Sequence, residues 1–213
     1  MSSCCRNDLD VKFDRRRARK QLKRYRANGP AKETRLLADG LIEAGVTGAT
    51  LLDVGGGIGA LADALLHAGA RSAVNVDASR DYLAAADELA SERGYRDRVK
   101  LRAGDFVDTA AELAPADIVT LDKVVCCYPD AERLVALSTE RAQRLYGLVF
   151  PQDGVLVRAI AVAENAFQRL GRAEFRTYIH PVARLEQLVR DAGFKPRWAA
   201  SHRMWLVRVY ERA

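Results

Sequence analysis

Four glycines follow an aspartate at the end of an apolar run, in the sequence Leu-Leu-Asp-Val-Gly-Gly-Gly-Ile-Gly-Ala at residues 51–60. Gly55, Gly57 and Gly59 allow the backbone to approach a ligand closely, because glycine has no side chain. A helix expected after them would point its free amide groups at the same place. The spacing also fits a loose G-x-G-x-x-A dinucleotide fingerprint, so the glycines alone do not identify the ligand.

Three acids narrow the choice of ligand. Asp53 precedes the glycines, where a carboxylate would repel a pyrophosphate and attract an ammonium group. Asp77 ends the next apolar run, where an acid can accept hydrogen bonds from both ribose hydroxyls. Asp105 follows the third run and can receive an adenine amino group, with Phe106 packed against the base. An ammonium group, a ribose diol and an adenine together describe S-adenosylmethionine. The competing interpretation is that Asp77 and Asp105 only cap helices.

Alternating apolar runs and helical patterns predict the elements that position these residues. We expect strands at 49–54, 73–77, 99–103, 117–121 and 145–150, and helices at 14–26, 31–44, 58–68, 79–92, 130–144, 154–170 and 181–191. Two strand-like pieces near 195–200 and 204–210 are close enough to form a hairpin. This order indicates an α/β fold, a mainly parallel sheet with helices on both faces.

Together these features resemble the class I S-adenosylmethionine-dependent methyltransferase family over about residues 35–210. The resemblance implies a Rossmann-like, seven-stranded, mostly parallel sheet with a C-terminal antiparallel hairpin, and S-adenosyl-L-methionine as the cofactor. The expected cofactor-binding residues are Asp53, Gly55, Gly57, Gly59, Asp77, Ala78, Asp105, Phe106 and Asp122. The methyltransferase domain is expected at 31–213, after a basic N-terminal arm or helix at 1–30.

The acceptor is expected beyond the fourth and fifth strands, by the rule that ligands bind at the carboxyl ends of an open parallel sheet. Lys123, Tyr128, Tyr178 and His180 are the candidates that would shape its pocket. His180 is the candidate base or orienting group, since histidine suits proton transfer at neutral pH. An insert at about 151–180 is longer than a plain connection needs, and we expect it to cover the pocket as a lid together with the arm.

Part of this region is similar to one branch of the family, the magnesium-protoporphyrin O-methyltransferases, which methylate a propionate carboxylate. The matching residues are Phe13-Asp14-Arg15, Val124, Tyr128-Pro129, Arg176, Tyr178 and His180. The chain departs from that branch at Lys123, where the branch has an acid, at Cys127, where it has a histidine, and in its glycine turn. The resemblance therefore implies a lid built as in this branch more strongly than it implies a porphyrin as the acceptor.

The sequence predicts a methyltransferase acting on a small-molecule acceptor, with oxygen as the first candidate atom. A second hypothesis is a thiol or metalloid methyltransferase that uses Cys126 and Cys127. The competing interpretation is that these two cysteines are small apolar residues that only pack. An RNA methyltransferase, a protein that binds S-adenosylmethionine without catalysis, and a nicotinamide dehydrogenase also stay open.

Composition and charge set the remaining expectations. The 213 residues suit one domain with additional arms, and the net charge is +6. The basic run at 15–26 could grip phosphates or a membrane surface, or could be a solvated helix face or a covering arm. Sparse aromatic residues disfavour nucleic acid.

The compartment follows from what the sequence lacks. No apolar run is long enough to span a membrane and no secretory signal is seen, so a cytoplasmic protein is expected. The adjacent pairs Cys4-Cys5 and Cys126-Cys127 are expected to be reduced, and no metal site is expected because CxxC spacing is absent. The sequence does not determine the oligomeric state.

Overall fold

The computed structural model describes residues 13–170 and 175–213 of the chain. Cys4-Cys5 and the first part of the arm lie outside these ranges. The strands are β1 (Thr50–Val54), β2 (Ser72–Asp77), β3 (Val99–Ala103), β4 (Ala116–Asp122), β5 (Ala142–Pro151), β6 (Phe194–His202) and β7 (Trp205–Arg212). The helices are α2 (Arg15–Asn28), α3 (Lys32–Glu43), α4 (Ala60–His67), α5 (Arg80–Glu92), α6 (Phe106–Thr109), α7 (Ala131–Arg141), α8 (Val155–Leu170) and α9 (Val182–Asp191).

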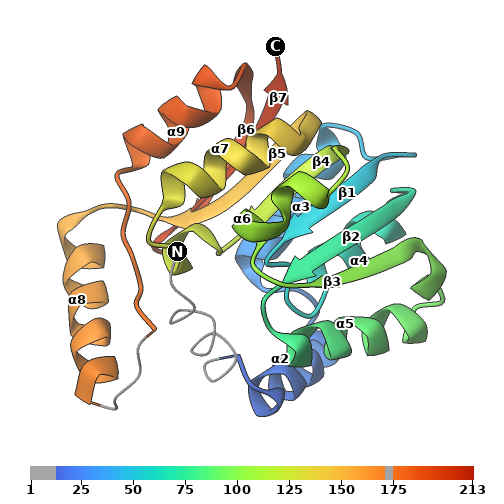
Figure 1. Cartoon of the computed structure of the whole chain (residues 1–213), viewed down its shortest axis with the longest axis horizontal. Helices are drawn as coiled ribbons and strands as arrows, with labels where there is room; N and C mark the ends of the chain where they lie inside the picture. Colours follow the sequence, from blue (N-terminus) through green and yellow to red (C-terminus); the bar gives the residue numbers. More distant parts are fainter. Residues whose placement is uncertain (1–12, 171–174) are drawn as a thin grey trace.

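The seven strands form one twisted sheet in the order β3-β2-β1-β4-β5-β7-β6 (Figure 1). β1 to β5 pair in parallel, and β7 pairs antiparallel with both β5 and β6. The expected Rossmann-like sheet with a C-terminal antiparallel hairpin is confirmed. Because β1 to β4 run in parallel, the acids at or just after their carboxyl ends meet at one edge of the sheet.

Two hydrophobic clusters cover the two faces of the sheet. Helices α3 and α4 supply Leu37, Leu41 and Leu65 to one cluster, and α7 and α9 supply Leu134 and Val189 to the other. The central strands are buried on both faces, as expected for parallel strands between helices. None of the helices in the described ranges combines the length and apolar content of a bilayer-spanning segment.

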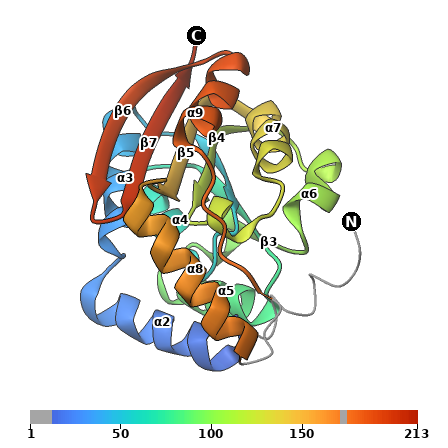
Figure 2. The same cartoon turned by 90° about the vertical axis from the view of Figure 1, so that its left-hand side faces the viewer.

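Helix α2 lies beside α5, outside the layer formed by α3 and α4 (Figures 1 and 2). Asp14 caps its start by accepting a hydrogen bond from the Arg17 amide at 2.8 Å, and Gly29 ends it with a φ of 72°. Both ends of this helix agree with the sequence pattern within two residues.

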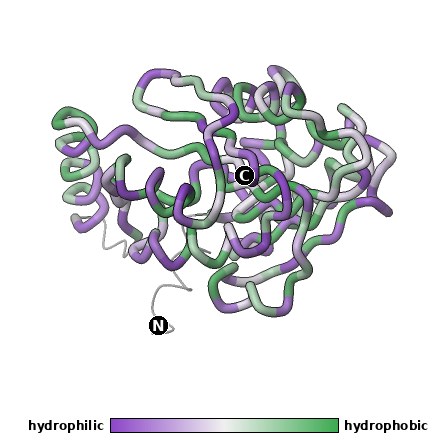
Figure 3. Tube along the Cα trace, turned by 90° about the horizontal axis from the view of Figure 1, so that it is seen from above, coloured by the Kyte–Doolittle hydropathy of each residue, from purple (hydrophilic) through white to green (hydrophobic). Residues whose placement is uncertain are grey.

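Helix α8 stands apart from the sheet at the edge of the molecule (Figures 1 and 3). Its inner side is held by Asn165, whose side chain bonds the backbone of Thr177 through both its amide nitrogen and its oxygen, each at 2.8 Å. Its outer side exposes Val155, Leu156, Val162 and Phe167. The helix therefore fills most of the long connection between β5 and α9.

The sequence pattern was wrong about where the helix after 130 ends. The expected helix at 130–144 stops at Arg141, and the fifth strand begins at Ala142 rather than at 145. Pairing explains the difference, because Ala142 lies opposite Ala116 of β4 and its carbonyl accepts a hydrogen bond from Arg212 of β7. Tertiary pairing thus overrides a helical propensity that continues past Arg141.

Candidate functional site

The glycine turn connects the end of β1 to α4. Gly55, Gly57 and Gly59 all have positive φ angles, of 63°, 56° and 78°, which a residue with a side chain adopts only with strain. Gly59 is the N-cap of α4 and leaves the first amides of that helix without a side-chain cap. Its left-handed conformation is also why the helix expected from residue 58 begins at Ala60. The turn therefore presents backbone donors and a positive helix end.

Asp53 lies beneath this turn and is 0% exposed. The hydroxyl of Thr120 on β4 donates to one of its oxygens at 2.7 Å, and the other, Oδ2, has no hydrogen-bond partner in the described part of the chain. Burial raises the pKa of Asp53 to about 7, against the lowering effect of the Thr120 bond and with added repulsion from Asp122 and Asp77. A carboxyl group that accepts no second bond is poised between its neutral and charged forms near pH 7.

Asp77 joins the end of β2 to the glycine turn. One of its oxygens accepts from the Gly57 amide at 2.9 Å, and the other accepts from the Ser79 amide at 2.8 Å. Ser79, in turn, caps α5 and donates from its hydroxyl to the carbonyl of Phe13 at 2.6 Å. Asp77 thus organises the turn, and its carboxylate still lines a cavity.

Asp105 follows β3 and serves as the N-cap of α6, accepting from the Val107 amide at 2.9 Å. The hydroxyl of Tyr128 donates to its two oxygens at 3.0 and 2.9 Å. Burial, together with the charge and hydrogen bond of Asp105, raises the pKa of Tyr128 well above its ordinary value, so the phenol remains protonated. The capping interpretation is correct for Asp105 but incomplete, because Asp105 and Phe106 also line the cavity that Asp77 lines.

Two adjoining cavities lie over this edge of the sheet. The inner cavity has a volume of about 320 Å³ and is lined by Asp77, Ala78, Asp105, Phe106, Cys127 and Tyr128, among others. The outer cavity, of about 770 Å³, is lined by Asp53 and by helix α2. Gly55, Gly57, Asp122 and Lys123 line both. The structure therefore places Asp77 and Asp105 in the wall of one cavity and Asp53 in the wall of the cavity beside it.

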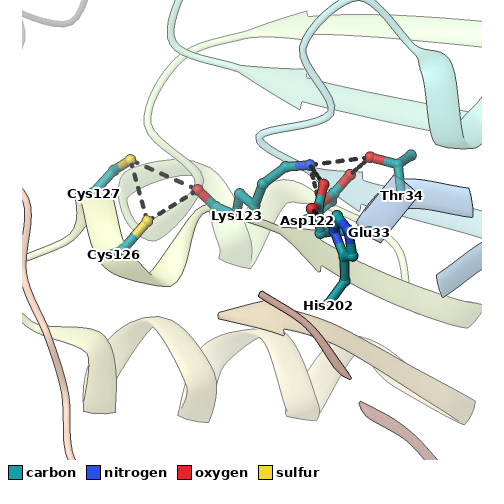
Figure 4. A network of polar contacts seen from close by, with 7 residues as sticks. All are labelled: Glu33, Thr34, Asp122, Lys123, Cys126, Cys127 and His202. Carbon is teal, nitrogen blue, oxygen red and sulfur yellow. Dashed lines mark hydrogen bonds and ion pairs between the residues drawn. The ribbon is translucent and has the colours of Figure 1, made fainter. Parts of the chain in front are cut away.

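Asp122, the last residue of β4, and Lys123, which follows it, lie within a polar network (Figure 4). The Lys123 ammonium lies 3.2 Å from the Thr34 hydroxyl, 3.2 Å from Asp122 and 3.8 Å from Glu33. The Thr34 hydroxyl also donates to Asp122. Lys123 has a φ of 63°, which is uncommon for a residue with a side chain.

Glu33 extends the same network to the C-terminal hairpin. The ring nitrogen Nδ1 of His202, the last residue of β6, lies 2.6 Å from a carboxylate oxygen of Glu33. Burial alone would raise the pKa of Glu33, but the hydrogen bonds from His202 and its own backbone and the charge of Lys123 outweigh it and hold that pKa below its ordinary value. Glu33 is therefore an ionised acid that fixes Lys123.

The adjacent cysteines occupy a short 3-10 turn, Val125–Cys127. Their sulfur atoms lie 3.9 Å apart, and both thiols point at the Lys123 carbonyl, at 3.4 Å and 3.7 Å (Figure 4). Cys126 is buried, and its contact with Cys127 and its burial raise its pKa. Among the described residues no group of three or more His, Cys, Asp or Glu side chains forms a metal site.

His180 and Tyr178 lie beside the site and are not among the described residues that line either cavity. The His180 Nε2 atom lies 2.9 Å from the Tyr128 carbonyl, and its ring stacks on Tyr178 with centroids 6.1 Å apart. The Tyr178 amide donates to the Cys126 carbonyl at 2.8 Å. These two residues therefore brace the turn that carries Tyr128 and the cysteines.

Several residues at the site escaped the sequence analysis. Asn75 donates to the Gly57 carbonyl at 3.2 Å, and its position as a polar residue inside an apolar strand was a usable signal. Thr120, another polar residue in a buried strand, offered the same kind of signal. Glu33 and Thr34 reach the site from α3, and nothing in their local sequence indicates it.

Comparison with known proteins identifies a matching domain and similar folds. Residues 51–145 match the family model described as a methyltransferase domain. The fold is similar to that of magnesium protoporphyrin IX methyltransferase from Synechocystis PCC 6803, with a TM-score of 0.73 and 20% identity over 96% of each chain. It is also similar to an O-methyltransferase family protein from Burkholderia thailandensis, with a TM-score of 0.75 and 16% identity over 97% of this chain and 63% of that one.

A third solved structure, a putative RNA methyltransferase from Pyrococcus horikoshii, gives a TM-score of 0.58 and 14% identity over 85% of this chain and 84% of that one. At such identities the likeness concerns the fold. No curated protein sequence matches this chain.

Residues 51–145 therefore carry a methyltransferase domain, and the seven-stranded sheet around it has the fold of the S-adenosylmethionine-dependent methyltransferases that the chain resembles. The residues present fit the cofactor, since the inner cavity offers carboxylates and an apolar wall of Phe106, Val54 and Leu134 where a nucleoside needs both.

Proposed function

We propose that this enzyme transfers a methyl group to an oxygen atom of a small-molecule acceptor. The observation that carries the cofactor part of the proposal is the placement of Asp77 and Asp105, from the ends of two neighbouring strands, in one cavity with the glycine turn. The similarity of the fold to an O-methyltransferase family protein supports oxygen as the acceptor atom. In this proposal Asp77 and Ala78 bind the ribose, and Asp105 with Phe106 binds the adenine. Gly55, Gly57 and Gly59 admit the methionine portion, with Asp53 and Asp122 on its ammonium side.

The chemistry asks little of the protein beyond positioning. S-adenosylmethionine, when bound, supplies an electrophilic methyl on a sulfonium, so a carbon–oxygen bond forms as the carbon–sulfur bond breaks. Lys123 and Tyr128, which line the cavity, would align the acceptor and exclude water. Tyr178 and His180 would hold in place the turn that carries Tyr128 and the cysteines. A carboxylate acceptor needs no base, whereas a hydroxyl acceptor must release a proton.

The test incubates the protein with methyl-labelled S-adenosylmethionine and a panel of carboxylates, phenols, thiols and arsenite. Asp77→Ala should abolish labelling and cofactor binding, because the variant loses the acid proposed to hold the ribose. Asp81→Ala is the matched control, since Asp81 is an exposed acid in the first turn of α5. Circular dichroism checks that both variants fold. Cofactor binding by Asp77→Ala equal to that of the control would refute the assignment.

A second candidate is methylation of a soft metalloid at the cysteine pair. Its support is the 3.9 Å sulfur separation and the position of Cys127 in the wall of the inner cavity. The raised pKa of Cys126 counts against it, because a neutral thiol is a weak ligand. The double variant Cys126→Ser/Cys127→Ser separates the two candidates. Unchanged arsenite methylation, or its absence in the wild type, excludes the metalloid.

A further inference from the structure

Helix α2 carries a strong positive charge over the outer cavity. Its sequence, RRRARKQLKRYRAN, contains eight arginines and lysines and no acid. Only one of these cations, Arg26, forms ion pairs among the described residues, with Glu88 and Glu92 of α5. The remaining charges need a partner of opposite sign or remain solvated.

Packing fixes which of these charges face the cavity. Ala18, Leu22 and Tyr25 are buried and hold α2 in one rotational position. Arg16, Arg17, Lys20 and Arg24 consequently line the outer cavity. Three of them, Arg16, Lys20 and Arg24, are spaced four residues apart along one side of the helix, and we call these three the cation row. Arg15, Arg19 and Lys23 are each one residue earlier, are exposed, and do not line it.

The acids around the outer cavity do not neutralise the cation row. Asp14 caps α2, and Asp122 is engaged by Thr34 and Lys123. Asp53 is buried beneath the turn with a pKa of about 7. None of the three forms an ion pair with the cation row within the described ranges.

Lys123, which also lines the outer cavity, is already surrounded by polar partners (Figure 4). Two acids, Glu33 and Asp122, lie within 3.8 Å of its ammonium. Its charge is therefore balanced within the protein. The uncompensated positive potential of the outer cavity comes from α2.

We propose that the methyl acceptor is a small anion whose carboxylate or phosphate group, remote from the methylated atom, is bound by Arg16, Lys20 and Arg24. This inference rests on the proposed function and names the substrate class for that site. The concave shape supports a small ligand, because about 770 Å³ lies within the range of roughly 300–1,000 Å³ usual for small-molecule sites. Outside the first 35 residues the chain is slightly acidic, which does not suit a long nucleic acid.

The experiment compares two triple variants with equal loss of charge. Arg16→Gln/Lys20→Gln/Arg24→Gln removes the cation row, and Arg15→Gln/Arg19→Gln/Lys23→Gln removes its outward-facing neighbours. Calorimetry at low salt measures binding of citrate and of pyrophosphate, which distinguishes a carboxylate from a phosphate site. We expect at least one probe to bind the wild type and the outward variant alike, and to bind the cation-row variant about tenfold more weakly.

S-adenosylmethionine binding is measured in the same three proteins and should agree within about twofold. If the wild type did not bind S-adenosylmethionine, the proposed function would be refuted. The comparison of anion binding between the two variants would still test the cation row. Failure of both probes to bind the wild type would overturn the anion site, as would equal weakening in the two variants. Salt-sensitive binding of single-stranded RNA, reduced equally by both variants, would show instead that the whole helix serves nucleic acid.

Discussion

Gly56 lies directly over the carboxyl group of Asp53. A Cβ atom at Gly56 would come within 2.6 Å of the Asp53 Oδ2 atom and within 2.6 Å of the Asn75 Oδ1 atom. These are the two oxygens beneath the turn that have no hydrogen-bond partner in the described part of the chain. The glycine turn therefore rests on a buried pair of acceptors, and a proton on Asp53 is what would relieve their repulsion.

Asp53→Asn should stabilise the cofactor-free protein at neutral and alkaline pH. The folded state raises the Asp53 pKa from 3.8 to about 7, so the folded protein keeps a proton that the unfolded chain has lost between those values. Wild-type stability therefore falls, relative to the variant, as the pH rises from about 4 to 7, and the difference then levels off. Three pKa units correspond to about 4 kcal/mol as an upper estimate.

Urea unfolding of both proteins at pH 5, 6, 7 and 8 measures this effect. The free energy of unfolding gained by Asp53→Asn over the wild type should grow across the series. Thr120→Val serves as the control, because it removes the hydroxyl donor and keeps the acid. A constant difference between wild type and Asp53→Asn at every pH would contradict the raised pKa.

Gly56→Ala should disrupt the cofactor site. The added methyl has no room above Asp53 and Asn75, whose positions are fixed by the paired strands β1 and β2. We expect a loss of about 1–3 kcal/mol in stability, as for overpacking of a core, and weak cofactor binding. Gly154→Ala is the control, because nothing lies within 4 Å of a Cβ there. Calorimetry and thermal unfolding measure the two effects, and wild-type behaviour of Gly56→Ala would refute the close contact.

Lys123→Met should destabilise the fold, because Glu33 and Asp122 would then share a partly buried site without their cation. We expect a loss of about 1–3 kcal/mol at pH 7. The lowered pKa of Glu33 contributes stability above its unfolded value of 4.5 that disappears as the pH falls through the folded value. The difference between wild type and variant should therefore shrink in acid. Lys123→Arg keeps the charge and should lose less, and equal losses in both variants would contradict the electrostatic account.

His180→Gln should retain most of the activity, whereas His180→Ala should lower kcat about tenfold. A glutamine amide can replace the donor at Nε2 that faces the Tyr128 carbonyl, and alanine cannot. Rates measured from pH 6 to pH 9 separate this positioning role from a catalytic base. If His180 were the base, both variants would lose activity equally and the pH dependence of the rate would differ from that of the wild type.

The strand-end acids were predictable because the sheet converts sequence order into position. Asp53, Asp77 and Asp105 each follow an apolar run, and parallel strands bring such ends together. What the pattern could not supply was their partners. Glu33 and Thr34 come from a helix far away in the sequence, and Tyr128 reaches Asp105 across 23 residues. Such contacts depend on how helices pack on the sheet, which local periodicity does not encode.

The basic run at residues 15–26 contained a pattern from which the orientation of its helix could have been predicted. Ala18, Leu22 and Tyr25 have the spacing of one buried helix stripe, and that stripe determines which cations face inward. His180 illustrates the opposite case. Its ring faces the Tyr128 backbone because of the path taken by residues 175–181, a stretch without regular structure. No periodicity exists there from which its direction could be predicted.

The anchoring of α2 has a consequence for the energetics of ligand capture. The Tyr25 hydroxyl donates to the buried Asp63 of α4, Arg26 pairs with two glutamates of α5, and the Phe13 carbonyl accepts from Ser79. The helix backbone is thus immobilised before any substrate arrives. An incoming anion then has to order the three side chains of the cation row but not the helix backbone, so less of the attraction is spent on arranging the site than if α2 were mobile. Tyr25→Phe removes one of these three anchors and no charge, and calorimetry with citrate and pyrophosphate should show weaker capture by this variant than by the wild type.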